Sequence, residues 1–195
     1  DGMAVLFDDT VANPTGDGTN VNMVTTLSPG LVTVNNSFSN YVFAGAGRIS
    51  GTTSLTKDGA ASLTIYTTND YAGDTVIKAG TLALGASGVL PSGSGKGNVL
   101  LTTNADGSLS GTLDLNGTTA AVNGLNGTGT VNNSAVGEAA LIVGSNNASG
   151  SFRGAIQNSG GALALLKTTG SEDKLVGIVS IGDIVKALLE EQRYR

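Results

Sequence analysis

The chain has 195 residues, of which 39% are hydrophobic, 4% aromatic and 13% charged, with 30 glycines and no tryptophan, so Val, Ile, Leu, Ala and Thr must fill any core. The formal net charge of −5, with six Lys and Arg before Ser171, excludes the basic patches that bind nucleic acid or anionic membranes, and neither partner is expected. The absence of His and Cys excludes imidazole metal sites, triads built on these residues, and disulfides.

The first forty residues contain three short apolar clusters separated by turn-rich runs, a pattern typical of short strands with exposed loops between them. The clusters are AVLF, VNMV and LVTV (Leu31 to Val34). The chain opens on Asp1 without a charged-then-apolar leader, and no apolar run approaches the roughly 18 residues that span a bilayer. We therefore expect a piece of a longer protein, with no membrane insertion of this segment.

Between Ser54 and Leu84 apolar residues alternate with small or polar ones, which is the period of strands with one buried face. The apolar positions are Leu55, Leu63, Ile65, Ile77, Ala79, Leu82 and Leu84. The strands are separated by residues that tolerate tight or left-handed backbone, namely Asp58-Gly59, Asn69-Asp70, Gly73-Asp74 and Gly80. Regular short strands joined by such corners indicate a chain that keeps winding.

This stretch resembles the autotransporter-associated β-strand repeat, which reads approximately L-x-K-x-G-x-G-x-L-x-L-x-G-x-N-x-Y-x-G-x-T-x-I-x-x-G-T-L. The matching positions are Leu55, Lys57, Gly59, Leu63, Ile65, Asn69, Tyr71, Gly73, Thr75, Ile77, Gly80, Thr81 and Leu82. Ala61 and Thr67 stand where the family prefers glycine. For residues 1–170 the resemblance implies a right-handed parallel β-helix that acts as a passenger or stalk, secreted or on the bacterial cell surface.

After the central stretch, a Gly/Ser-rich segment around Pro91 is interpreted as a loop that leaves a corner of the solenoid. Its Gly-Ser-Gly-Lys-Gly run, Gly93 to Gly97, lacks the spacing of a phosphate-binding loop. Further strands are expected at Val99 to Leu101, Leu113 to Leu115, Val122, Val131 and Leu141 to Val143. Asn-Gly pairs at positions 116, 123 and 126 fit either hairpins or corners, and their frequency favours corners.

A second, partial repeat is expected further along the chain. Its residues are Phe152, Gly154, Ile156, Leu163, Leu165, Lys167 and Gly170. From Phe43 to Phe152 is 109 positions and from Lys57 to Lys167 is 110, which predicts one long repeat and the start of the next.

The composition changes after Gly170, so residues 171–195 are predicted to be a separate segment, a strand followed by an amphipathic helix. This segment resembles the last strand and helix of a cystathionine-β-synthase (CBS) domain, in which residues matching Gly177, Ser180 and Asp183 contact the ribose of adenosine nucleotides. The rest of such a domain is missing, so we expect no nucleotide binding and interpret the chain as chimeric. We expect the helix to cover the open end of the solenoid. A flexible tag and a helix contact in a dimer remain alternatives.

Carboxylates are the acids and bases that the sequence offers for catalysis, and they are scattered. Asp70, Asp74, Asp106 and Asp114 each lie beside Gly or Asn, where Asp usually forms corners. Asp8-Asp9 and Asp17-Gly18 could supply oxygen ligands to Ca²⁺, but surface turns are the favoured interpretation. We therefore predict no catalytic, cofactor-binding or metal-binding residues, no cofactor and no enzymatic activity.

The sequence thus predicts an all-β, right-handed parallel β-helix of roughly seven to nine coils, with a short C-terminal helix as cap. The favoured function is a structural stalk or spacer of a large surface protein. The alternative is an adhesin-type module that binds a glycan or host protein, although Tyr41, Tyr66, Tyr71 and Tyr194 form no cluster in the sequence. The expected partners are flanking repeats of the parent protein, with possible weak end-to-end self-association.

Overall fold

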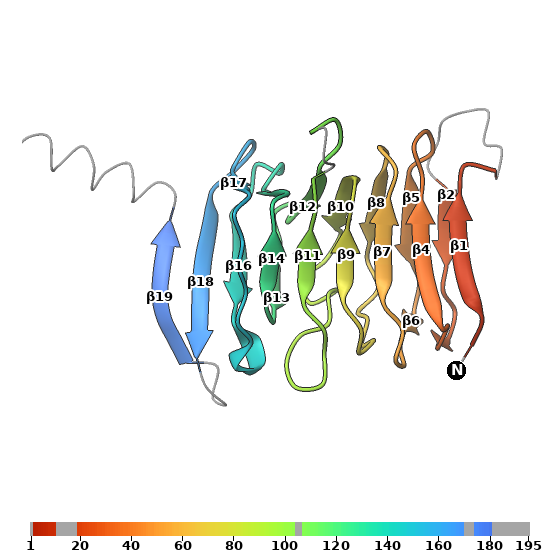
Figure 1. The fold of residues 1–195 in the computed structure, drawn as a ribbon, viewed down its shortest axis with the longest axis horizontal. Coiled ribbons are helices and arrows are strands. Elements are labelled where there is room, and N and C mark those ends of the chain that lie inside the picture. The colour runs from red at the N-terminus through yellow and green to blue at the C-terminus, as the bar shows by residue number, and fades with distance from the viewer. Residues whose placement is uncertain (1, 11–18, 104–106, 170–173, 181–195) are drawn as a thin grey trace, which may run out of the picture.

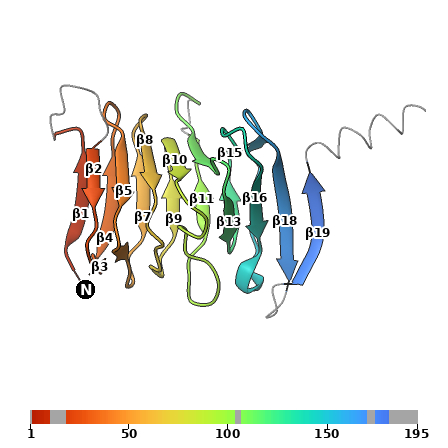
Figure 2. The ribbon, with the colours of Figure 1, turned by 180° about the vertical axis from the view of Figure 1, so that it is seen from behind.

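The structure, a computed structural model, describes residues 2–10, 19–103, 107–169 and 174–180. Within these ranges the chain forms strands and turns, with a single 3₁₀ turn, η1 (Ser145–Asn147), and no α-helix. Figure 1 shows the strands side by side along the long axis of the molecule, and Figure 2 shows the same order from behind. The fold is a parallel β-solenoid of about seven turns, as its seven-stranded sheet indicates.

Two long sheets contain most of the strands. The first sheet holds β1 (Ala4–Asp8), β4 (Leu31–Asn35), β7 (Leu55–Asp58), β9 (Thr75–Ile77), β11 (Val99–Leu101) and β14 (Leu125–Gly127). The second sheet holds β2 (Thr19–Asn22), β5 (Tyr41–Ala44), β8 (Ser62–Ile65), β10 (Gly80–Leu84), β12 (Gly111–Asp114), β15 (Thr130–Asn132) and β17 (Ala155–Gln157).

The remaining strands come third in their coils, after a second-sheet strand. At the N-terminal end they are β3 (Thr26–Leu27) and β6 (Arg48–Ile49). Towards the C-terminal end they are β13 (Thr119–Val122), β16 (Ala139–Val143) and β18 (Leu163–Thr169), followed by β19 (Lys174–Ser180).

Successive coils stack in parallel register. Leu55 pairs with Thr75, 20 residues later, and Ala4 pairs with Leu31, 27 residues later, so the coils differ in length. Among the strand pairs of the described ranges, only β18 with β19 is antiparallel. At Asn116 and Asn123 the Asn-Gly pairs therefore mark corners and not hairpins, as the sequence predicts. The corner predicted at Asn126-Gly127 is wrong, because both residues lie within β14 and pair with Leu100 and Leu101.

The core consists of side chains that stack from coil to coil. In the second sheet one such column contains Tyr41, Leu63, Leu82, Leu113 and Val131, all of which are buried. Every apolar position predicted from the alternation between Ser54 and Leu84 is also buried. Because each coil adds only a few aliphatic side chains, the core stays narrow, which explains how a chain without tryptophan can fill it.

The segment between β10 and β11 was predicted as a loop that leaves the solenoid, and this prediction is wrong in part. Val89 and Leu90 are only 1% and 5% exposed, and Pro91 is buried as well. These side chains cover the core on the side of the coil where other coils have their third strand, although no strand forms here. Hydrophobic burial thus holds the middle of the segment against the core while Gly88, Gly93 and Gly95 turn the backbone with positive φ.

The prediction of a second long repeat is also wrong. Lys57 lies on β7 in the first sheet, whereas Lys167 lies on β18, third in its coil. Phe43 belongs to the second sheet, but Phe152 pairs with Gly127 of the first. Coils of unequal length explain the discrepancy, because a spacing of 110 residues does not return the chain to the same side of the solenoid.

The strand predicted in the C-terminal segment is confirmed, since β19 pairs with β18 in the last coil. It runs antiparallel and the register shifts between Lys167 and Thr168. The predicted cap helix lies outside the described residues.

Gly59 and Gly88 provide a matched test of coil stacking, because both adopt positive φ (75° and 73°). A Cβ at Gly59 would lie 2.3 Å from the backbone oxygen of Asn36 in the preceding coil, whereas a Cβ at Gly88 would have no neighbour within 4 Å. Gly88→Ala should cost only the left-handed backbone penalty, about 1–2 kcal/mol. Gly59→Ala should cost clearly more in chemical denaturation. Equal losses would contradict the close approach of the two coils.

Candidate functional site

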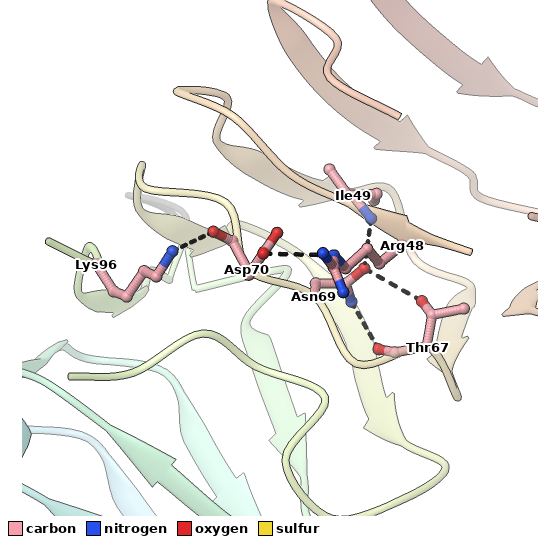
Figure 3. Close-up of polar contacts among 6 residues, drawn as sticks. All are labelled: Arg48, Ile49, Thr67, Asn69, Asp70 and Lys96. Atoms are coloured by element: carbon pink, nitrogen blue, oxygen red, sulfur yellow. Dashed lines mark hydrogen bonds and ion pairs between the residues drawn. The ribbon is translucent and has the colours of Figure 1, made fainter. Parts of the chain in front are cut away.

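One cluster brings a carboxylate close to two basic residues: Asp70 lies beside Arg48 and Lys96 (Figure 3). Arg48 Nε lies 3.3 Å from Asp70 Oδ2, and both side chains are about half exposed. Lys96 Nζ donates a hydrogen bond to the main-chain oxygen of Asp70 and not to its carboxylate. Asp70 Oδ1 is buried and accepts no hydrogen bond.

This cluster does not contain the pair of carboxyl groups that a glycosidase requires. Glycosidases use two carboxyl groups on opposite sides of the scissile bond, and here there is one. The three residues come from three successive coils: Arg48 from β6, Asp70 from the coil of β8, and Lys96 from the segment before β11. The arrangement joins coils at a corner, and exposed ion pairs of this kind contribute little free energy.

Asn69, beside this cluster, is 3% exposed and joins three coils through hydrogen bonds (Figure 3). Its Oδ1 accepts from the backbone N–H of Ile49 at 2.9 Å and from the Thr67 hydroxyl at 3.2 Å. Its Nδ2 donates to the main-chain oxygens of Thr67 and Val89 at 2.8 and 3.1 Å. The amide therefore satisfies buried backbone groups where the chain turns.

Other buried asparagines also form hydrogen bonds to main-chain groups at other corners. Asn36, Asn123 and Asn133 are each at most 1% exposed. Their Nδ2 groups donate to pairs of main-chain oxygens: those of Ser39 and Ser62, of Gly93 and Lys96, and of Gly137 and Ala162. Asn123 Oδ1 also accepts from the N–H of Gly93, so this N–H of the glycine-rich run is occupied by the protein itself and is not free for a phosphate.

Lys57 is a cation inside the solenoid. It is fully buried and stands in register between Val34 and Ile77, in a column of otherwise apolar side chains. Its Nζ donates to the main-chain oxygens of Asp58 (2.6 Å), Gly59 (2.7 Å) and Ala79 (3.2 Å), the last of which belongs to the next coil. Burial lowers the pKa of Lys57 to about 8, so at neutral pH the ammonium is still charged and all three of its donors are used.

The remaining acidic candidates act as predicted for corner formers. Asp74 Oδ1 accepts from the N–H of Asn98 at 2.7 Å, and Asp114 Oδ1 accepts from the N–H groups of Asn116 and Ser134, each at 3.0 Å. Asp106 and Asp17 lie outside the described residues. In the part of the chain that the structure describes, no group of three possible metal ligands comes together.

At Asp8 and Asp9 the sequence favours a surface turn over a Ca²⁺ site. Asp9 accepts hydrogen bonds from the backbone N–H groups of Ser37, Phe38 and Ser39, which together lower the pKa of its carboxyl. Asp8 bonds to Thr10. Both carboxylates therefore already have partners within the protein.

Sequence analysis missed the internal role of Lys57 and of the asparagines. A signal was present for Lys57, because it is two residues from buried Leu55 and so faces the same side of the strand. Asn69 was recognised only as a corner residue. Nothing in its local sequence indicates which distant backbone groups, those of Ile49 and Val89, it would bind.

The fold and its corners define a β-solenoid whose buried polar side chains bind its own backbone. Residues 55–84 match the family described as passenger-associated-transport-repeat, which confirms the resemblance to autotransporter repeats. The match covers 30 of the 195 residues, and it points to an autotransporter passenger segment and to a secreted or surface location. No curated protein and no solved structure matches the chain. Within the described part of the chain, no helix is long and apolar enough to cross a membrane.

The buried Lys57 predicts an unusual dependence of stability on pH. Its folded pKa of about 8 lies below the ordinary lysine pKa of 10.5, so between these values the unfolded chain binds more protons and the free energy of unfolding rises with pH. The expected slope is at most about 1.4 kcal/mol per pH unit. Near pH 10 the slope should reverse, because burial raises the pKa of Tyr41 and Tyr71.

The measurement is urea denaturation from pH 7 to 10, with Lys57→Met as the comparison. The difference between the two proteins should grow in favour of the wild type from pH 8 upward. Parallel curves for the two proteins would contradict a buried ammonium.

Proposed function

We propose that this segment is a structural stalk of an autotransporter-like surface protein and carries out no catalysis. The observation that carries the proposal is the use of polar groups: Lys57, Asn69 and the other buried asparagines bind the backbone of the solenoid itself. Such groups hold coils in register and offer nothing to a substrate. The passenger repeat at residues 55–84 supports the same role.

We also propose that further coils of the parent protein stack on the N-terminal end of this segment. There β1 and β2 are the outermost strands of their sheets, and a cavity of about 300 Å³ is lined by apolar side chains such as Val5, Phe7 and Met23. A stacked coil would satisfy both the open strand edges and the apolar surface. Without one, weak end-to-end self-association is expected.

Right-handed winding and a C-terminal cap are further parts of the proposal. Parallel strands of one sheet joined by a crossover are right-handed in about 98% of cases, which supports this hand for every coil. The amphipathic pattern of residues 181–189 supports a cap at the end opposite β1.

One observation favours the alternative of an adhesin-type module. Phe38 is 88% exposed, on a loop that Asp9 holds by three backbone hydrogen bonds. A rigidly presented aromatic side chain is a common anchor of binding surfaces. Tyr41 and Tyr71, in contrast, are buried and cannot contribute.

A glycan array distinguishes the two functions. The stalk proposal predicts no specific glycan signal for the wild-type chain, and none for Phe38→Ala. A specific signal that disappears in Phe38→Ala but survives the matched change Tyr66→Ala, at a half-exposed aromatic residue, would establish the adhesin function instead.

The absence of nucleotide binding is tested by calorimetry with adenosine nucleotides. We expect no saturable heat at micromolar concentrations, because half of a CBS-like cleft cannot enclose a ligand. A saturable heat that Asp183→Ala abolishes would overturn this part of the proposal.

A further inference from the structure

The corner after β7 brings a backbone N–H against the side chain of the residue before it. Gly59 N donates a hydrogen bond to Asp58 Oδ1 at 2.8 Å, with Gly59 at a positive φ of 75°. Because a carbon–oxygen bond of this kind is about 1.2 Å long, Asp58 Cγ lies at most about 4 Å from this nitrogen. Atoms that are poised to react lie about 3–3.5 Å apart. Attack of the nitrogen on Cγ would close a five-membered succinimide ring.

The Asn-Gly pairs of the described residues are held in a different way. In each of them the glycine N–H donates to a group far along the chain and not to the preceding side chain. The bonds are Gly117 N to Asn133 Oδ1 (2.9 Å), Gly124 N to Asn98 Oδ1 (2.8 Å) and Gly127 N to the main-chain oxygen of Ser151 (2.9 Å). These nitrogens must leave their hydrogen bonds before they can attack, so the stacking of the coils protects the three pairs.

The peptide group between Asp58 and Gly59 is also placed to stabilise negative charge. When such a group loses its N–H proton, the charge is shared between its nitrogen and its oxygen. This oxygen accepts hydrogen bonds from Lys57 Nζ at 2.6 Å and from the N–H of Asn36 at 3.1 Å. Donors aimed at an oxygen that becomes negative stabilise that state, and a charged donor does so more strongly than a neutral one. The corner therefore favours the reactive form of the Gly59 nitrogen.

We propose that Asp58 and Gly59 form a site of spontaneous self-modification, at which the aspartate becomes isoaspartate through a succinimide. The Gly59 nitrogen bonds to Asp58 Cγ, and the bond from Cγ to one carboxyl oxygen breaks. That oxygen leaves as water, with the N–H proton and a proton from solvent. Asp58 is only partly buried, so water can reach the ring and open it. Opening at Cγ restores aspartate, and opening at the main-chain carbonyl carbon gives isoaspartate, with nothing oxidised or reduced.

Isoaspartate would disturb the stacking of coils at this corner. It routes the main chain through the side chain and so adds one methylene group between Asp58 and Gly59. The corner has no room for this group, because even a Cβ at Gly59 would lie 2.3 Å from the main-chain oxygen of Asn36. The solenoid therefore ages chemically at this corner. The proposal rests on the local geometry and not on the stalk function, so the two can fail separately.

The variant Asp58→Asn in the full chain tests the proposal with internal controls. It turns the corner into a fourth Asn-Gly pair, which closes the same ring with ammonia as the leaving group. In denaturant all four pairs should deamidate at similar rates, because each is an Asn followed by Gly. In the folded chain at neutral pH, position 58 should react at least about tenfold faster than each of the other three pairs. Peptide mapping by mass spectrometry measures each rate.

Equal rates at the four positions, or a slower rate at position 58, would overturn the proposal if hydrogen exchange shows that the variant is folded. If the variant does not fold, the wild-type chain decides without any substitution. Isoaspartate at position 58, which an isoaspartyl methyltransferase labels, should accumulate faster in the folded chain than in denaturant. A slower rate in the folded chain would contradict the proposal.

Discussion

The structure depends on satisfying backbone groups at the corners of stacked coils. In the sheets, parallel pairing satisfies the N–H and C=O groups, but at each corner the chain leaves the sheet while it is still buried. Asn69 and Lys57 resolve this at two corners of one coil, the first with an amide that both accepts and donates, the second with an ammonium that donates three times. Leaving such a group unpaired costs about 1–3 kcal/mol.

This constraint explains why the chain is poor in groups available for chemistry. A narrow core offers each coil only a few inward positions, and several of them hold polar side chains that are committed to the backbone. The acids behave likewise, since Asp9, Asp74 and Asp114 accept hydrogen bonds from backbone N–H groups of their own or neighbouring coils. What remains outside is mostly polar, with isolated exposed apolar side chains such as Phe38, Tyr66 and Val136.

Much of the fold could be predicted because each strand of the solenoid is marked by a pattern in a few consecutive residues. The alternation from Leu55 to Leu84 gives burial directly, and Gly59 marks a corner by its conformational freedom. The path of the chain between coils was less predictable. Val89 and Leu90 are buried in a segment with loop composition, and the long repeat failed because coil length varies. The partners of Asn69 are far from it in sequence, and only the stacked coils bring them together.

Hydrogen exchange in Asn69→Ala tests most directly whether buried corner amides hold the coils in register. The variant removes the acceptor of the Ile49 N–H, which lies one coil away. The account predicts a marked loss of protection at Ile49 and at the corner before Asp70, with little change in β12 and β15. Asn126→Ala, which removes the acceptor of the Ser151 N–H at an exposed site, should affect only the protection around Ser151. Unchanged protection at Ile49 in Asn69→Ala would contradict the account.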